Sequence, residues 1–393
     1  MGPIYLDNNA TTRPLPQVVD AVDRMLRDHW HNPSSIHRPG QEARQLIELA
    51  RASVAALIGA RPRELVFTSG ATESIDLAIR GVLESTGRRT IVTTRIEHEA
   101  VRDVCDVLAR RGEAEIRWLP VTARGIVDVD ALPDLLDDTV ALVSLQWANN
   151  ETGAIQPIDA VGALCRERGV LLHSDATQWI GKMPTDVTLM PVDTVSFSAH
   201  KFHGPKGVGA LWLRRGVRVR PRLHGTQEQE RRGGTENAPG IVGMGAAAEC
   251  ATQWLADADE RARLATLRDT FEQTLLSAVP DAQRNGPASP RLWNTTNIGF
   301  PRLESEALLL LLSERGVCAS AGAACSSGSL NPSPVLLAMG VPDAVAHGAL
   351  RFSISRETTE QELREAATRI AECVDRVRAS SSNLDMPQSL DNA

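Results

Sequence analysis

Lysine is scarce in this chain, and the few lysines are the first residues that could carry unusual chemistry. The 393 residues include 39 arginines but only three lysines, Lys182, Lys201 and Lys206. Arginine stays protonated and cannot form a Schiff base with a carbonyl compound, whereas a lysine amine can. Two of the lysines stand in one glycine-bearing stretch, SAHKFHGPKGVG at residues 198–209. Although an isolated lysine is more often a solvated surface residue, this stretch is the first place to look for amine chemistry.

A second candidate for chemistry is a cysteine in a run of small residues. Cys325 lies within SAGAACSSGS at residues 320–329, a composition that favours neither helix nor strand. Such a stretch predicts a mobile, exposed loop, in which a thiol could reach a substrate and then a separate acceptor. No C-x-x-C pair occurs among the six cysteines, so zinc and thioredoxin-type chemistry have little support. The pattern around Cys318 is ambiguous, although a core position is favoured for it. The other cysteines are interpreted as core thiols: Cys105, Cys165, Cys250 and Cys373.

Three further side chains have the chemistry of a cofactor or substrate site, and each also has an ordinary structural interpretation. Asp175 could pair with a protonated ring nitrogen or could simply cap a helix. His98 could stack on an aromatic ring and transfer protons, or it could be a structural histidine. Arg351, between apolar residues, could bind a carboxylate through two hydrogen bonds or form a structural ion pair. Taken one by one, these residues leave the alternatives open.

A fold must position these residues, and the sequence predicts an α/β protein. Apolar runs of strand length alternate with amphipathic stretches of helix length, the pattern of a mainly parallel sheet covered by helices on both faces. Ligands of such sheets bind at the carboxyl ends of the strands, where several of the candidate residues stand. Gly70, Ala71 and Thr72 also open a helix directly after a strand, so they could hold a phosphate or form only a turn. The predicted strands are residues 64–68, 90–94, 116–121, 140–145, 170–173, 194–197 and 208–213, and the helices between them include 72–83, 100–111 and 160–168.

The pattern changes near residue 249 and predicts a second, smaller α+β domain. Residues 249–263 indicate a long, charge-rich connecting helix, and the last helix is predicted from residue 359 to about residue 378. The expected division is 13–255 for the large domain, 1–12 with 256–379 for the small domain that carries the Cys325 loop, and 380–393 for a disordered tail.

The composition excludes several classes of partner. A net charge of −7 and a pI near 5.8 argue against nucleic acid or an anionic membrane as the main partner. No apolar run approaches the ~18 residues of a membrane span, and the first residues lack the basic flank and apolar stretch of a secretion signal. We therefore expect a cytoplasmic protein with no membrane, nucleic-acid or metal partner.

Ten short motifs identify a family. In register along nearly the whole chain, the sequence resembles the cysteine desulfurases of the NifS/IscS type. The motifs, in the family's order, are DNNATT (7–12), NPSSIH (32–37), SGATES (69–74), EH (97–98), ANNETG (148–153), SDATQ (174–178), SAHKFHGPKGVG (198–209), RRGGTEN (231–237), ACSSGSLNPS (324–333) and LRFSISR (350–356).

This resemblance implies a homodimeric enzyme of fold type I, related to the class V aminotransferases, that uses pyridoxal 5'-phosphate to remove sulfur from L-cysteine. Lys201 would bind the cofactor as a Schiff base, and His98 would stack on its ring and move protons. Cys325 would attack the substrate sulfur and keep it as a persulfide while alanine leaves. Asn150 and Arg351 would hold the substrate carboxylate. The residues implied in cofactor binding are Ala71, Thr72, Asn150, Asp175, Gln178, Ser198, His200, Lys201 and, from the partner subunit, Thr235.

The resemblance leaves the destination of the sulfur open. An iron–sulfur scaffold or another sulfur-acceptor protein is the expected partner, with tRNA thiolation and DNA sulfur modification as further destinations. The full-length stretch around Cys325 resembles the group whose long loop delivers sulfur directly to several acceptors. Pro334 and Leu337 depart from the family's pattern just after it and could alter docking of the acceptor.

Two other functions remain as alternatives. A selenocysteine lyase or another pyridoxal-phosphate transferase would use the same sheet and lysine, and sequence cannot separate sulfur from selenium substrates. A non-catalytic scaffold in a sulfur-transfer assembly would be expected to have lost Lys201, Asp175 or Cys325, and all three are present.

Overall fold

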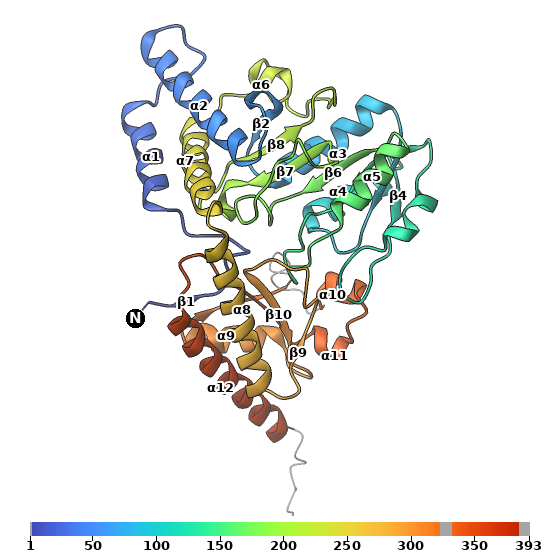
Figure 1. Cartoon of the computed structure of the whole chain (residues 1–393), viewed down its shortest axis with the longest axis vertical. Helices are drawn as coiled ribbons and strands as arrows, with labels where there is room; N and C mark the ends of the chain where they lie inside the picture. Colours follow the sequence, from blue (N-terminus) through green and yellow to red (C-terminus); the bar gives the residue numbers. More distant parts are fainter. Residues whose placement is uncertain (1, 323–331, 385–393) are drawn as a thin grey trace, which may run out of the picture.

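The computed structural model describes residues 2–322 and 332–384, which form two parts with separate hydrophobic cores (Figure 1). The larger part is built on a seven-stranded sheet. Its strands are β2 (Leu65–Thr68), β3 (Thr90–Thr93), β4 (Glu115–Trp118), β5 (Val140–Ser144), β6 (Leu171–Asp175), β7 (Thr194–Ser198) and β8 (Gly209–Leu213). They lie in the order β2-β8-β7-β6-β5-β3-β4, and β8 alone among them is antiparallel to its neighbours. The predicted α/β fold with a mainly parallel sheet is confirmed.

Helices cover both faces of this sheet because successive strand residues point to opposite sides. In β5, Val143 and Leu142 are both buried, but they belong to different cores. Val143 packs on the side of one group of helices and Leu142 on the side of another. The first group is α1 (Pro16–Asp28), α2 (Arg38–Leu57), α5 (Ile158–Glu167) and α7 (Ala238–Leu255), and the second is α3 (Ala71–Thr86) and α4 (Glu99–Arg110).

The smaller part is built on a four-stranded antiparallel sheet in the order β12-β13-β10-β9. The N-terminal strand joins it, because β1 pairs with β11 and both Ile4 and Leu6 lie in the small core. Residues 4–6 thus pack with the small part, and the predicted domain boundaries stay a prediction. The elements are β1 (Ile4–Tyr5), α8 (Ala258–Ala278), β9 (Gln283–Arg284), β10 (Thr295–Gly299), α9 (Ser305–Glu314), β11 (Val317–Cys318), β12 (Ser320–Ala321), α10 (Pro334–Ala338), α11 (Asp343–Ala346), β13 (Ala349–Ser353) and α12 (Glu360–Leu384).

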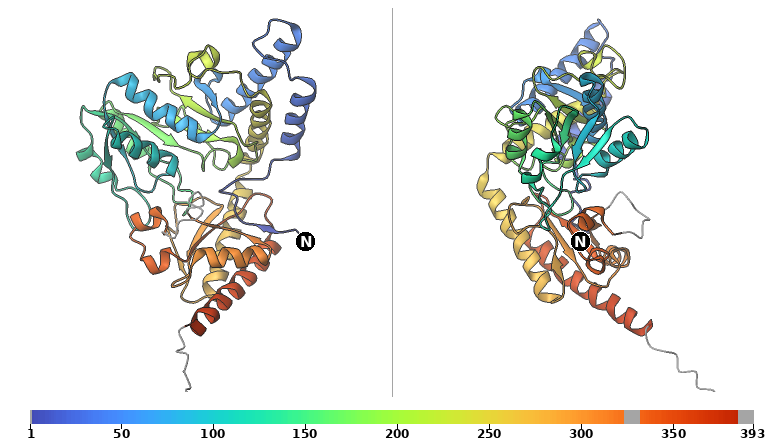
Figure 2. Two further views of the ribbon diagram at one scale, coloured as in Figure 1. Left: turned by 180° about the vertical axis from the view of Figure 1, so that it is seen from behind. Right: turned by 90° about the vertical axis from the view of Figure 1, so that its right-hand side faces the viewer.

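The predicted connecting helix over residues 249–263 is wrong, because the chain breaks there into two helices. Helix α7 ends at Leu255, and α8 begins after Asp257, whose carboxylate accepts a hydrogen bond of 3.0 Å from the backbone N–H of Glu260. This N-cap satisfies a free N–H group at the start of a new helix. Figure 2 shows α8 running from the large part down along the small part.

The predicted disordered tail begins too early. Residues 380–384 continue α12, since their sequence, SSSNL, contains no glycine or proline to end the helix. Among the residues described, no helix is both long and apolar enough to cross a bilayer.

Candidate active site

One cavity at the carboxyl edge of the large sheet gathers most of the predicted site residues. Its volume is about 630 Å³. It lies where β6 and β7 end and where α3 and α4 begin, the position that a parallel sheet offers to ligands. The predicted residues that line it are Ala71, Thr72, His98, Asn150, Asp175, Gln178, Ser198, His200 and Lys201.

The start of α3 forms an anion cradle on one side of the cavity. Gly70 is the N-cap and has no side chain to cap the free N–H groups of the first turn. Ala71 and Thr72, the first two residues of that turn, line the cavity. A Cβ on Gly209 would lie 2.7 Å from Cα of Gly70, so only glycine at 209 lets β8 pass this close to the cradle. Such a helix start is suited to a phosphate group.

Lys201 reaches the cavity from the end of β7. The strand ends at Ser198, and a single 3-10 turn, Ala199–Lys201, follows it. The Nζ atom of Lys201 donates to the main-chain carbonyl oxygens of Asn9 at 2.6 Å and Ala10 at 2.9 Å. The amine is therefore held where the N-terminal segment crosses the sheet edge. No role was predicted for these two residues, although the motif DNNATT contains both.

Asp175 is the last residue of β6 and is buried at the cavity wall. Its Oδ1 accepts a hydrogen bond of 2.9 Å from the backbone N–H of Thr177, within a turn. The alternative role as a helix N-cap is wrong, because residues 176–182 form turns and no helix begins there. A buried carboxylate at this point is suited to a cationic partner in the cavity.

His98 caps α4 at the opposite wall. Its Nδ1 accepts a hydrogen bond of 3.1 Å from the backbone N–H of Ala100, so the neutral ring carries its hydrogen on Nε2. Burial lowers the pKa of this imidazole, the positive charge of Lys201 lowers it further, and Asp175 opposes the shift. The ring is therefore neutral at physiological pH. The structural interpretation is confirmed by the helix cap, and the chemical role stays a prediction.

His200 is a second neutral imidazole of the cavity wall. Its Nδ1 lies 3.2 Å from Oγ1 of Thr11. Burial lowers the pKa of His200 to about 4, and the charges of Lys201, Lys206 and Lys182 contribute. A neutral ring can donate or accept a hydrogen bond here without adding charge to a site that already holds lysines.

Arg351 lies behind the cavity rather than in its wall. It is 2% exposed in β13, and its guanidinium forms an ion pair of 2.7 Å with Asp7 and donates at 3.1 Å to the carbonyl oxygen of Asn150. Its Nε has no hydrogen-bond partner among the described residues. Arg351 therefore forms a structural ion pair in this conformation, and its binding of a substrate carboxylate stays a prediction.

Two further predicted residues are Thr235 and Cys325. Thr235 is exposed, away from the cavity of its own chain, as expected of a residue predicted to act on a partner subunit. Cys325 lies outside the described residues. Among the remaining cysteines, Cys105 and Cys165 are buried as predicted, and burial raises the pKa of each thiol to about 12, which leaves them unreactive. The described residues hold no group of three or more metal-ligating side chains.

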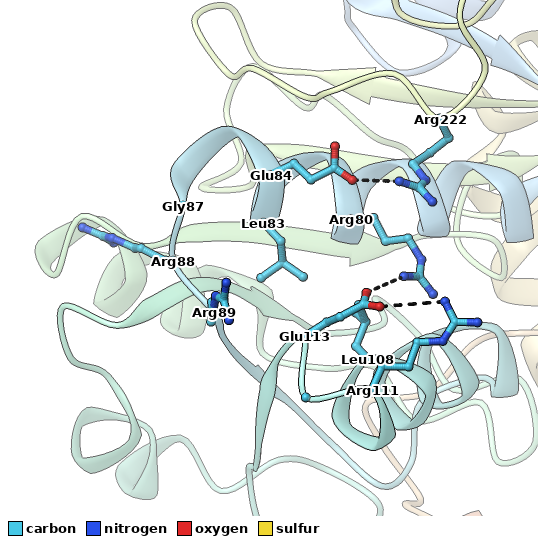
Figure 3. A pocket seen from close by; sticks show the side chains of 11 residues that line it. Arg80, Leu83, Glu84, Gly87, Arg88, Arg89, Leu108, Arg111, Glu113 and Arg222 are labelled. Carbon is cyan, nitrogen blue, oxygen red and sulfur yellow. Dashed lines mark hydrogen bonds and ion pairs between the residues drawn. The ribbon is translucent and has the colours of Figure 1, made fainter.

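A second cavity, of about 480 Å³, lies at the ends of α3 and α4 and is lined by arginines (Figure 3). Three of these arginines have carboxylate partners within the same surface. Arg222 pairs with Glu84 at 2.8 Å, and Arg80 pairs with Glu113 at 3.4 Å. Arg111 also approaches Glu113, at 3.8 Å. None of the predicted site residues lines this cavity.

The single sheet, with helices on both faces and a lysine at its carboxyl edge, is typical of an α/β enzyme whose cavity is organised around an amine. The chain belongs to the aminotransferase class-V family, whose model matches residues 4–365. It is 47% identical over 383 residues to a cysteine desulfurase of Trichormus azollae, an alignment covering 97% of this chain and 95% of the relative. It is 46% identical over 366 residues to the cysteine desulfurase NifS of Azotobacter vinelandii, with 92% and 90% covered. A solved NifS-like protein superposes with a TM-score of 0.88 at 38% identity, over 95% of this chain and all of that one.

Proposed function

We propose that this chain is a pyridoxal-phosphate-dependent cysteine desulfurase, which converts L-cysteine to L-alanine and transfers the sulfur to Cys325. The observation that carries the proposal is the single cavity in which Lys201, Asp175 and the uncapped start of α3 meet. The full-length relatives that are cysteine desulfurases support it.

The residues of the cavity fit this cofactor group by group. The α3 cradle, kept open by Gly209, would hold the phosphate, and Asp175 would pair with the ring nitrogen. Two buried polar atoms of the wall, Oδ1 of Asn150 and Oγ1 of Thr177, have no hydrogen-bond partner among the described residues. Buried polar atoms are rarely left unpaired, so they suit a bound polar molecule. When bound, pyridoxal phosphate acts as an electron sink for the bond cleavages at the substrate.

Two side chains can move protons at the substrate. The Lys201 amine, once free of the cofactor, is within the cavity and can take and return a proton. His98 is neutral because burial lowers its pKa, and its Nε2–H is the hydrogen that the ring can donate. The Ala100 N–H occupies its other nitrogen, which fixes the ring orientation.

Asn150 and Arg351 are suited to a substrate carboxylate, although only Asn150 lines the cavity. Arg351 donates to the Asn150 carbonyl oxygen, and its Nε has no hydrogen-bond partner among the described residues. Arg351 can therefore support the Asn150 turn and attract an anion at the same time. To bind a carboxylate with both nitrogens of its fork, Arg351 would have to release Asp7.

The described residues on either side of the Cys325 segment lie close to this cavity. Ser333 Oγ donates a hydrogen bond of 2.5 Å to Oε2 of Glu151, the residue after Asn150. Gly322 packs against the same carboxyl group so closely that a Cβ would clash with it. This anchoring supports the transfer step. In that step the Cys325 thiolate would bond to the substrate sulfur, and the carbon–sulfur bond would break with its electron pair left on carbon. That carbon would then take a proton, so that alanine leaves while Cys325 keeps a persulfide.

We propose further that the enzyme is a cytoplasmic homodimer that passes its sulfur to an iron–sulfur scaffold or another acceptor protein. Exposed apolar side chains on and near α1 and α2 support association, since exposed clusters of such residues mark interaction surfaces. Thr235 would then complete the cofactor site of the partner subunit. The exposed residues are Val19, Leu26, Trp30, Ile36 and Leu49.

The test measures alanine and sulfide released from L-cysteine in the presence of a reductant, with wild type and Cys325→Ala, after the visible spectrum of each protein is recorded. We expect equal amounts of the two products from wild type and a loss of both in the variant, which should keep the cofactor absorption. A yellow wild-type protein that forms neither product would mean that the substrate is wrong. A protein that binds no pyridoxal phosphate would overturn the proposal.

A further inference from the structure

Lys182 is a buried lysine to which the proposed reaction gives no role. It follows β6 by seven residues and is 4% exposed. Burial lowers the pKa of its amine well below the usual value, and the nearby charges of Lys201 and Arg351 lower it further. Burying a lysine amine costs free energy unless its N–H groups are hydrogen-bonded. The hydrogen-bond partners of Lys182 therefore indicate its role.

The amine of Lys182 has two hydrogen-bond acceptors. Its Nζ donates to Oε1 of Gln178 at 2.5 Å and to Oδ1 of Asn9 at 2.9 Å. The same Asn9 oxygen also accepts from Nδ2 of Asn294 at 2.9 Å, so its carboxamide orientation is fixed independently. Because two contacts need only two hydrogens, they persist even when the amine is neutral.

These contacts determine which way the Gln178 carboxamide points. Its oxygen faces Lys182, and its Nε2 donates to the main-chain oxygen of Asn9 at 2.9 Å. Reversing the amide would set its NH2 group against the donor of Lys182 and its oxygen against the Asn9 carbonyl. Gln178 lines the cavity, and an amide nitrogen has two hydrogens, so one remains for an acceptor in the cavity.

The Asn9 carbonyl oxygen connects this arrangement to the amine of the site. It accepts from Gln178 Nε2 and, at 2.6 Å, from Lys201 Nζ. Lys182, Gln178, Asn9 and Lys201 therefore form one connected network across the sheet edge. In such networks, the loss of one member changes the geometry of the others.

We propose that Lys182 is a positioning residue of the cofactor pocket: it fixes the Gln178 carboxamide so that a hydrogen-bond donor, not an acceptor, is presented to the cavity. The inference rests on the proposed function, because it assumes that the donor serves an oxygen of pyridoxal phosphate. Lys182 itself lies behind Gln178 and does not line the cavity.

The test compares Lys182→Met, Gln178→Leu and the double variant, each stripped of cofactor and titrated with pyridoxal phosphate. Lys182→Met removes the donor but keeps an unbranched side chain, and we expect it to weaken cofactor affinity about tenfold, the effect of one strong hydrogen bond. The pH at which the visible band of the bound cofactor changes should move as well. Because Lys182 acts through Gln178, the double variant should bind hardly more weakly than Gln178→Leu alone.

Two controls isolate the effect. Arg89→Met removes one positive charge from an exposed residue of the arginine-lined cavity and should leave both readouts unchanged. Urea unfolding without cofactor checks that each variant folds. If Lys182→Met does not fold, Gln178→Glu keeps an oxygen facing Lys182 but offers no donor to the cavity, and it should lose affinity to the same extent.

The outcomes separate this inference from the proposed function. Wild type that binds no cofactor, or releases no alanine, would refute the proposed function. If wild type binds cofactor and releases alanine, two results would overturn the role of Lys182 alone. One is that Lys182→Met keeps the cofactor affinity and band position of wild type. The other is that its effect adds fully to that of Gln178→Leu.

Discussion

The active-site cavity and the arginine-lined cavity both contain many charged side chains, but these charges are satisfied differently. In the arginine-lined cavity, guanidinium groups pair with carboxylates of the same surface, such as Arg222 with Glu84. In the active-site cavity, Lys201 contacts main-chain carbonyl oxygens, and polar atoms of Asn150 and Thr177 are buried without a partner among the described residues.

This difference explains why one cavity is suited to a ligand and the other is not. A guanidinium–carboxylate pair is already neutralised, so a ligand that binds at Arg80, Arg111 or Arg222 would have to displace an internal partner. A polar group that is buried without a partner costs free energy, which a bound molecule can recover. Unpaired polar groups, rather than charge or volume, therefore distinguish the site.

The largest effect should come from Lys201, the centre of the active-site cavity. We expect Lys201→Ala and Lys201→Arg both to lower alanine formation from L-cysteine roughly 10²- to 10⁴-fold, since the acid–base and Schiff-base roles require an amine. Steady-state assays and visible spectra measure the change. If Lys201→Arg stayed active, the positive charge alone would account for the role of this position.

A smaller effect is expected where the cavity meets the small domain. Arg351→Lys keeps a charge but loses the fork that contacts Asp7 and Asn150. We expect its KM for L-cysteine to rise about tenfold to a hundredfold, the value of one charge-assisted hydrogen bond, with cofactor affinity unchanged. Asp7→Asn is the matched variant, because it weakens the internal ion pair and leaves Arg351 in place. A higher kcat/KM in Asp7→Asn would mean that Asp7 competes with the substrate.

The pH dependence of stability should also differ between the two regions. His173, in β6 behind Asp175, has its pKa lowered to about 4 by burial. Between pH 6.5 and 4, His173 is protonated in the unfolded chain but stays neutral in the folded chain. The free energy of unfolding therefore falls as the pH falls through this range. Among the described residues, no histidine lines the arginine-lined cavity.

Urea unfolding of cofactor-free protein at pH 7, 6 and 5 measures this effect. We expect His173→Asn to be less stable than wild type at pH 7, because it weakens the 2.8 Å contact with Thr194, but to lose less stability on acidification. An unchanged pH slope in the variant would show that other groups cause the acid sensitivity.

The features predicted well from the sequence are those that depend on neighbouring residues. The strand ends at Asp175 and Ser198, and the helix start at Ala71, follow from local apolar runs and turn residues, and a parallel sheet brings such ends to one edge. These local rules pointed to Ala71, Asp175 and Lys201 as candidates at one sheet edge, whereas the roles of Asn150 and Gln178 were implied by the family resemblance.

The features that were not predicted depend on how distant segments pack. The N-terminal segment places Asn9 beside Lys201, 192 positions away, and pairs Asp7 with Arg351. No periodicity indicates such contacts. The same is true of Lys182, which the sequence marked only as one of three lysines, and of the break at Asp257, where a single capping side chain decides between one helix and two.

The smallest effect is expected in the arginine-lined cavity. Arg222 pairs with Glu84 and lies 3.5 Å from Asp76, but its side chain is 41% exposed, so solvent screens these contacts. We expect Arg222→Ala to change the free energy of unfolding by no more than ~1 kcal/mol and cysteine turnover by less than about twofold. Urea unfolding and alanine release measure both, with Glu84→Gln as the partner variant. Since Arg222 is already paired with carboxylates of its own surface, a tenfold loss of turnover in either variant would show that a cavity of internally paired side chains can still serve the reaction, and the distinction between the two cavities would fail.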